Sequence, residues 1–205
     1  MPHAQFVRRG RPLFELLGAL ALPLAAQNAI EQNTWQTTPT YIARCVRVEG
    51  DVHAPIAEVW RVFTTSRGAE EFFAQKANIG LALGGPYEIQ FDPNDERSGT
   101  KGLKILSYAP QEMISFQWNA PPQFPTVRNG GTWVVVAMRP IDATNTQVTI
   151  MHLGFKQGFE WDEAYAHFQQ GWSELMTRLQ KRFTDGPIDW GKQRMMYQEP
   201  AAAHP

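Results

Sequence analysis

With 205 residues, this chain is long enough for one domain with a full hydrophobic core, and two large domains are not expected. Charged residues make up 19% of the sequence and leave a net charge of -1, so there is no positive field to gather nucleic acid or an anionic membrane. We therefore expect no nucleic-acid partner. The single cysteine, Cys45, excludes an internal disulfide and a cysteine-based zinc site.

The N-terminal segment has the features of a secretory signal. Three arginines, Arg8, Arg9 and Arg11, precede a short apolar run over residues 13–26 that ends in small residues. We interpret residues 1–27 as a signal peptide of an exported or periplasmic protein. The alternative is a cytoplasmic protein, because Glu15 interrupts the apolar run. The run is shorter than the roughly 20 residues that span a bilayer, so no stable membrane span is expected. The polar residues 28–40 are interpreted as a linker.

The folded domain is predicted to begin at residue 41 with a strand and two short helices. Val46, Val48 and Val52 alternate with charged residues, as a half-buried strand requires. Pro55 then opens a helical pattern, since proline is tolerated in a first turn and apolar residues follow at spacings of three and four. A second short helix is expected over residues 67–74.

Strand signals follow as far as the last helix. Gly84 and Gly85 separate two short apolar runs and indicate a hairpin. Turn-rich segments divide the later runs, which cover residues 103–110, 113–118, 131–138 and 147–155. Their spacing predicts consecutive antiparallel strands and a sheet of six or seven strands in all.

The most informative segment is a long C-terminal helix, predicted over residues 161–183. Its apolar side chains recur three or four residues apart and form one broad face. They are Trp161, Tyr165, Phe168, Trp172, Leu175, Met176, Leu179 and Phe183. Such bulky residues are best buried against one side of a sheet, and a strongly curved sheet leaves a gap beneath the helix. We expect function to lie in that gap. The domain thus covers residues 41–184, and residues 185–205 are interpreted as a tail.

Five segments of the domain resemble the SRPBCC or START-like superfamily, and within it the branch named after the activator of heat-shock-protein ATPase. They are HAPIAEVWRVFTT at 53–65, GGPYEI at 84–89, GLKILSYAPQEMISFQW at 102–118, TQVTIMHLGF at 146–155 and GWSELMTRLQKRF at 171–183. The resemblance covers roughly residues 43–183 in the right order. It implies an α+β helix-grip fold, in which a curved antiparallel sheet wraps around the C-terminal helix and an apolar cavity lies between them.

The same resemblance implies no universal catalytic residue, and we expect no cofactor. The chain departs from the branch at one point. Many members carry an acidic and a basic residue shortly before the double glycine, whereas NIGLAL stands there in this chain. That difference favours an apolar ligand over a charged one.

His152 is the first candidate for chemistry. It shares strand parity with Val148 and Ile150, so it faces the helix if they do and places a titratable ring in an apolar gap. It would then bind a ligand carbonyl or act as an acid or base; the alternative is a structural histidine satisfied by one hydrogen bond. The other residues expected to line the cavity are apolar or aromatic, with core packing as the alternative for each. They are Tyr87, Phe116, Trp118, Trp133, Ile150, Phe168 and Trp172.

Two further features complete the prediction of the site. No metal site is expected, because the other histidines lack ligand spacing and the acidic residues over 92–96 lack the spacing of a calcium loop and are interpreted as a solvated turn. Gly171 interrupts the last helix, which costs about 1 kcal/mol relative to alanine. Close packing on a strand is the favoured reason for this glycine, and space for a ligand is the alternative.

Three functions are compatible with these observations. In the first, an apolar or aromatic small molecule or lipid binds between the helix and the sheet. In the second, a cyclase or hydrolase uses His152 in the same cavity. In the third, the domain is a chaperone-activating interaction module, as the name of the branch suggests. The first is favoured, because the sequence contains no nucleophile elbow and no phosphate-binding loop.

Overall fold

The computed structural model of the protein describes residues 44–95 and 97–192. The predicted signal peptide over 1–27 and the linker over 28–40 lie outside the described residues, and so does the part of the tail from residue 193 onward. No helix in the described ranges is long and apolar enough to cross a membrane.

The elements follow one another in the order that an α+β fold with a terminal helix requires. They are β1 (Arg44–Val52), α2 (Ile56–Thr64), α3 (Ser66–Glu70), β2 (Lys76–Ile79), β3 (Tyr87–Gln90), β4 (Ile105–Ala109), β5 (Met113–Trp118), α4 (Pro125–Gly130), β6 (Thr132–Pro140), β7 (Thr146–Phe155) and α5 (Phe159–Asp185). The predicted helix-grip architecture, with seven strands, two short helices after the first strand and a long C-terminal helix, is confirmed.

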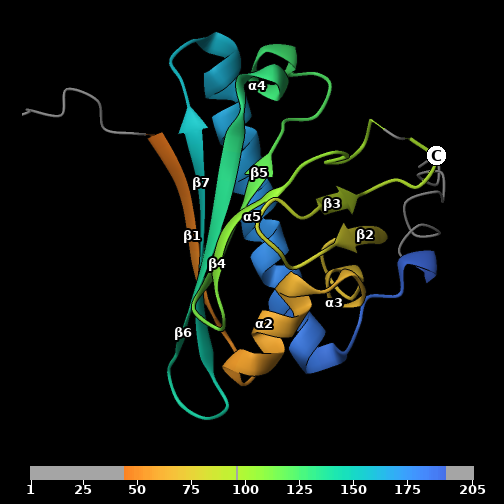
Figure 1. The fold of residues 1–205 in the computed structure, drawn as a ribbon, viewed down its shortest axis with the longest axis vertical. Helices are drawn as coiled ribbons and strands as arrows, with labels where there is room; N and C mark the ends of the chain where they lie inside the picture. The colour runs from red at the N-terminus through yellow and green to blue at the C-terminus, as the bar shows by residue number, and fades with distance from the viewer. Residues whose placement is uncertain (1–43, 96, 193–205) are drawn as a thin grey trace, which may run out of the picture. The chain divides into compact units, whose positions relative to one another are not determined.

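The main sheet has five antiparallel strands in the order β1-β7-β6-β5-β4, and β2 and β3 form a separate hairpin. The hairpin is joined to the chain leading into β4, because the amide of Tyr87 donates to the carbonyl of Leu103 at 2.9 Å. In Figure 1 the helices α2, α3 and α5 and the hairpin all lie on the same side of the main sheet. That side of the sheet is therefore the inner face.

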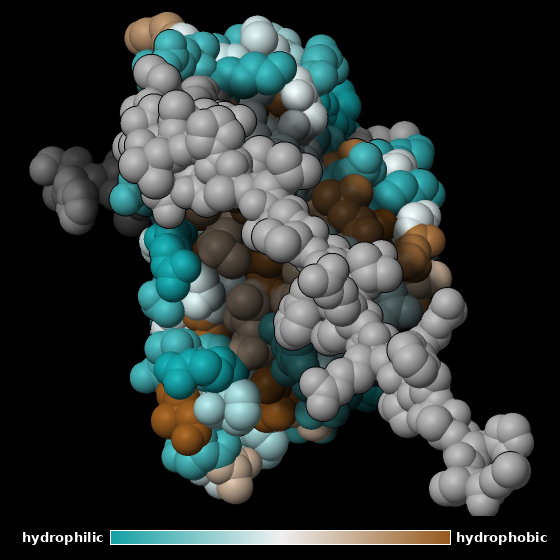
Figure 2. Space-filling model, turned by 60° about the vertical axis from the view of Figure 1, so that its left-hand side comes forward, coloured by the Kyte–Doolittle hydropathy of each residue, from teal (hydrophilic) through white to brown (hydrophobic). Residues whose placement is uncertain are grey.

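Strand alternation decides which side chains reach the inner face. Val46 and Val52 of β1 are buried while Arg47, Glu49 and Asp51 are exposed, as the sequence pattern predicts. The outer face of the sheet carries both apolar and polar residues. Figure 2, which turns the left-hand side of Figure 1 toward the viewer, shows hydrophobic and hydrophilic residues side by side there.

The helix α5 lies on the inner face and buries the predicted apolar stripe. Six of the eight predicted residues are buried, and Tyr165 and Phe183 are partly buried against the core. The helix approaches β1 most closely at Gly50, where a Cβ atom would lie 2.8 Å from Cγ of Met176. A larger residue at this point of the strand would therefore force the side chain of Met176 to move.

The sequence pattern did not predict α4. The helix has only six residues, too few to display an apolar period, and it begins with a proline and ends before Gly131, which has a left-handed conformation. Its first amide groups are satisfied from outside the helix. The carboxylate of Glu160 in α5 accepts hydrogen bonds from the amides of Thr126 at 2.6 Å and Val127 at 3.0 Å. A tertiary contact thus fixes α4 against the start of α5.

A nearly buried carboxylate connects the other end of α5 to the short helices. Glu71 is 13% exposed in its side chain and accepts hydrogen bonds from Arg61 of α2 at 3.1 Å and from Arg182 of α5 at 2.6 Å. Burial alone raises the pKa of Glu71, but the hydrogen bonds from the two guanidinium groups outweigh it and hold the pKa below its ordinary value.

The described start of the tail packs close to this ion pair. The indole of Trp190 donates to the carbonyl of Glu70 at 2.6 Å, and the amide of Ile188 donates to the carbonyl of Glu71 at 2.9 Å. Residues 188–190 of the predicted tail are therefore attached to α3.

We predict that Glu71→Gln lowers the free energy of unfolding by about 2–4 kcal/mol, because it leaves Arg182 largely buried without a counter-charge. The matched control is Glu58→Gln, which removes an exposed partner of Arg61 and should cost less than about 1 kcal/mol. The folded-state pKa of Glu71 is depressed, so its stabilisation is present above the ordinary pKa of glutamate and is lost as the pH falls through the lowered value. Denaturant titrations of the wild type and both variants at pH 7 measure the free energy of unfolding. Equal losses of this free energy in Glu71→Gln and Glu58→Gln would contradict the prediction.

Candidate functional site

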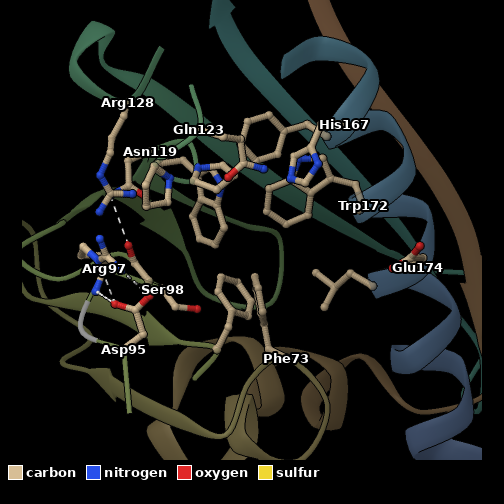
Figure 3. A pocket seen from close by; sticks show the side chains of 18 of the residues that line it. Phe73, Asp95, Arg97, Ser98, Asn119, Gln123, Arg128, His167, Trp172 and Glu174 are labelled. Atoms are coloured by element: carbon tan, nitrogen blue, oxygen red, sulfur yellow. Dashed lines mark hydrogen bonds and ion pairs between the residues drawn. The ribbon is translucent and has the colours of Figure 1, made fainter. Parts of the chain in front are cut away.

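The described residues contain a cavity of about 450 Å³ on one flank of α5. Its walls come from the middle of α5, from the end of β5 with the following segment 119–123, from the loop after β3, and from Phe73 after α3. Figure 3 shows these side chains around an open space. The cavity therefore lies between the helix and the loops at one side of the sheet, and among the strands of the main sheet only β5 contributes to it, through Trp118.

Aromatic rings form the inner wall of the cavity. Trp118 lies 5.1 Å from Trp172 and 5.8 Å from Phe73 between ring centroids, and Phe73 meets Trp172 edge to face at 6.1 Å. These spacings and tilts are those that aromatic pairs prefer, and the three rings come from β5, α5 and the turn after α3. The arrangement presents an apolar surface to which a flat molecule can pack.

The rim of the cavity is polar. Arg97 and Asp95 form an ion pair at 3.1 Å in the loop after β3. The side-chain amide of Asn119 donates to the carbonyl of Gly99 at 3.3 Å, which ties that loop to the end of β5. His167 of α5 also lies on the rim, and burial lowers its pKa, so its ring is neutral at pH 7. The loop over 92–96, interpreted from the sequence as a solvated turn, thus contributes to the cavity wall through Asp95.

Gly171 leaves part of the cavity empty. It lines the cavity, and a Cβ atom built on it would meet nothing within 4 Å. The favoured explanation, close packing on a strand, is therefore wrong for Gly171, and the close approach of helix to strand occurs at Gly50 instead. The alternative explanation, space for a ligand, stays a prediction.

The structure places the predicted site residues in three different surroundings. Trp118, Phe168 and Trp172 line the cavity. Tyr87, Phe116 and Ile150 are fully buried in the core; the ring of Tyr87 stacks on Phe116 at 3.7 Å and its hydroxyl donates to the carbonyl of Phe63 at 3.1 Å. Burial raises the pKa of Tyr87, so its hydroxyl stays protonated. These three residues support the cavity wall from behind.

Trp133 lies on the other face of the sheet. It is 39% exposed and is out of step with its buried neighbours Val134 and Val136, because successive residues of a strand point to opposite faces. Its ring packs over Gly154, where a Cβ atom would lie 2.8 Å from the indole. Trp133 therefore does not line the cavity beside α5. The strand parity that places His152 on the inner face of the sheet also predicts that Trp133 lies on the outer face.

His152 is completely buried behind the cavity wall. Its ring centroid lies 4.4 Å from that of Phe168, and its Nδ1 accepts a hydrogen bond from the indole Nε1 of Trp172 at 3.1 Å. Because an indole N–H can only donate, the proton of the neutral ring lies on Nε2. That atom has no hydrogen-bond partner among the described residues. Burial lowers the pKa of His152 to about 3, so the ring is neutral and orients Trp172.

Several cavity residues were missed by the sequence reasoning. Phe91, Asn119 and Arg128 lie outside the predicted helices and strands, and Phe73 lies in the helix predicted over 67–74 but beyond Glu70, where α3 ends in the structure. A weak signal existed for Phe91, which ends the apolar run of β3. No group of three or more histidine, cysteine or acidic side chains in the described ranges is arranged to hold a metal ion.

Comparison with known families gives one match over most of the domain. The model of the family described as "Activator of Hsp90 ATPase homolog 1-like protein" matches residues 53–184. No curated protein matches the chain significantly.

Solved structures share the fold at low identity. A protein of Mesorhizobium loti is 22% identical with a TM-score of 0.58, and the match covers 71% of this chain and 100% of that one. A protein of Bacillus halodurans is 21% identical with a TM-score of 0.54, covering 68% and 96% of the two chains. The Aha1 dimer of Colwellia psychrerythraea is 15% identical with a TM-score of 0.55, covering 70% and 98%. At these identities the likeness shows the fold alone.

The buried neutral His152 predicts a specific dependence of stability on pH. Its pKa is about 3 in the folded state and 6.5 when unperturbed, so the unfolded chain takes up a proton that the folded chain excludes. The free energy of unfolding should therefore fall as the pH drops from about 6.5 toward 3, by up to about 1.4 kcal/mol per pH unit from this residue.

His152→Asn tests this pH dependence, because asparagine keeps an acceptor near Nδ1 and does not titrate. Denaturant titrations from pH 5 to 7 give the free energy of unfolding of both proteins. As the pH falls, this free energy should decrease more in the wild type than in the variant. Parallel curves for the two proteins would show that His152 does not titrate in this way.

Proposed function

The chain belongs to the Activator of Hsp90 ATPase homolog 1-like protein family, and from this membership and the cavity beside α5 we propose that it binds an apolar or aromatic small molecule. The observation that carries the proposal is an aromatic-walled cavity of about 450 Å³ beside a closely packed core. Apolar side chains exposed in a cavity gain free energy when a ligand covers them.

The geometry of the wall supports a flat ligand. Phe73, Trp118 and Trp172 pack on one another and each expose 5% or less of their surface, so a flat ligand would contact only the part of each ring that faces the cavity. Burial of apolar surface contributes about 25 cal/mol per Å² before the costs of association, so the affinity depends on how much of the ligand's own surface the cavity covers.

The position of Gly171 also supports this proposal. A glycine within a helix costs about 1 kcal/mol relative to alanine, and no close contact in the structure requires one at this position. Gly171 is exposed and lines the cavity, so a glycine there keeps the helix side of the cavity open.

The enzyme alternative is less well supported. It requires His152 to exchange a proton with a ligand, whereas the ring reaches the cavity only through Phe168 and Trp172 and is neutral because of its burial. The chaperone-activating alternative concerns a protein partner, and a variant that fills the cavity should leave such an activity unchanged.

We predict that Gly171→Leu abolishes binding of a neutral aromatic probe, because the new side chain enters the cavity. The probe is N-phenyl-1-naphthylamine, whose fluorescence rises in apolar surroundings, and the wild-type protein should bind it with micromolar affinity. Gly171→Ala should retain most of the binding and raise the free energy of unfolding by up to about 1 kcal/mol.

The matched control is Ala166→Leu, which adds the same side chain at an exposed position of α5 that does not line the cavity. It should bind the probe as the wild type does. Equal binding by the wild type and by Gly171→Leu would place the probe elsewhere and remove the support for this cavity.

A further inference from the structure

Arg128 is a cation at the cavity rim that makes no direct ion pair among the described residues, although its charge helps to lower the pKa of Asp95. Its Nη1 donates to the carbonyl of Ala120 at 2.5 Å, and no ion pair joins it to a carboxylate among the described residues. This hydrogen bond holds the guanidinium group in place and leaves its other N–H groups free for a further acceptor. The side chain is half-buried, so its charge is less screened than that of a fully exposed arginine.

The charges around the cavity favour an anion. Three arginines and two carboxylates line it, which gives a local balance of +1 with His167 neutral, although the whole chain has a net charge of -1. Arg97 is already paired with Asp95, so Arg128 is the more available of these two cations. In Figure 3 the side chains of Arg97 and Arg128 lie on one side of the cavity and Trp172 on the other.

Charge and aromatic surface are thus separated across a single cavity. An apolar ring can occupy the side formed by Trp118 and Trp172 while an attached acidic group reaches Arg128. A guanidinium group matches the geometry of a carboxylate, and its planar fork donates two parallel hydrogen bonds to the two oxygens. A local balance of +1 suits a monoanion better than a phosphate with two charges.

We propose that the ligand is a planar aromatic monocarboxylate, with its ring against the aromatic wall and its carboxylate bound by Arg128. This inference rests on the proposed function and refines it by naming the class of ligand. It also replaces the expectation from the sequence that an apolar ligand is favoured over a charged one. The reason is that Arg128 belongs to α4, a helix that the sequence pattern did not predict.

The experiment compares two probes of nearly equal shape, 2-naphthoate and its neutral amide, 2-naphthamide, by quenching of tryptophan fluorescence. The wild-type protein should bind 2-naphthoate about 10-fold more tightly, and the preference should weaken at high salt. Arg128→Gln should remove the preference and leave the affinity for 2-naphthamide unchanged, which also shows that the variant is folded. Arg128→Lys should retain part of the preference, because lysine keeps the charge and loses the fork.

The matched control is Arg139→Gln, which removes one positive charge from the exposed end of β6, where Arg139 donates to Gln147. It should bind both probes as the wild type does. Equal affinity of the wild type for the two probes would overturn the carboxylate assignment and leave the proposed function intact. A preference that survives in Arg128→Gln would overturn the role of Arg128. Failure of both probes to bind the wild type would overturn this inference, and failure of N-phenyl-1-naphthylamine as well would overturn the proposed function.

Discussion

The helix α5 is held at both ends, and this constraint explains the cavity on its middle turns. Near its start, Glu160 binds the first amides of α4, and Arg44 of β1 forms an ion pair with Asp162. Near its end, Met176 fills the space above Gly50, and Arg182 is paired with Glu71. The turns between these contacts carry Gly171, which meets no neighbouring side chain on its cavity side. These middle turns also contact the sheet through Phe168 and Trp172, and the space lies on the flank of the helix that faces the loops.

The cavity has an apolar inner wall and a polar rim. Its inner side is made of rings that are also part of the core, so the surface is rigid; Trp172, for example, is oriented by its hydrogen bond to His152. Its rim comes from loops and from α4, which supply Asp95, Arg97 and Arg128 together with the amides of Asn119 and Gln123. A rigid apolar wall facing an adjustable polar rim is the usual construction of a small-molecule site. His152 acts in this arrangement as a support for the wall.

Periodicity predicted the parts of the fold that contain regular elements. The spacing of three and four over residues 161–183 identified α5 and its buried face, and strand alternation placed Val46, Ile150 and His152 inward. The same rule explains why Trp133, out of step by one residue, faces outward. The position of the cavity was not predictable in this way, because Phe91, Asn119 and Arg128 lie on segments without a period. The space at Gly171 depends on the distance between α5 and loops that are remote from it in the sequence. A local sequence pattern does not predict that distance.

A crystal structure of the purified protein with 2-naphthoate tests most directly whether the clamped helix leaves a ligand site at its middle. We expect the naphthalene ring against the cavity side of Phe73, Trp118 and Trp172, the carboxylate at Arg128, and α5 still attached through Glu71 and Glu160. A cavity closed by movement of α5 onto the loops, with the probe bound elsewhere or not at all, would contradict this interpretation of the structure.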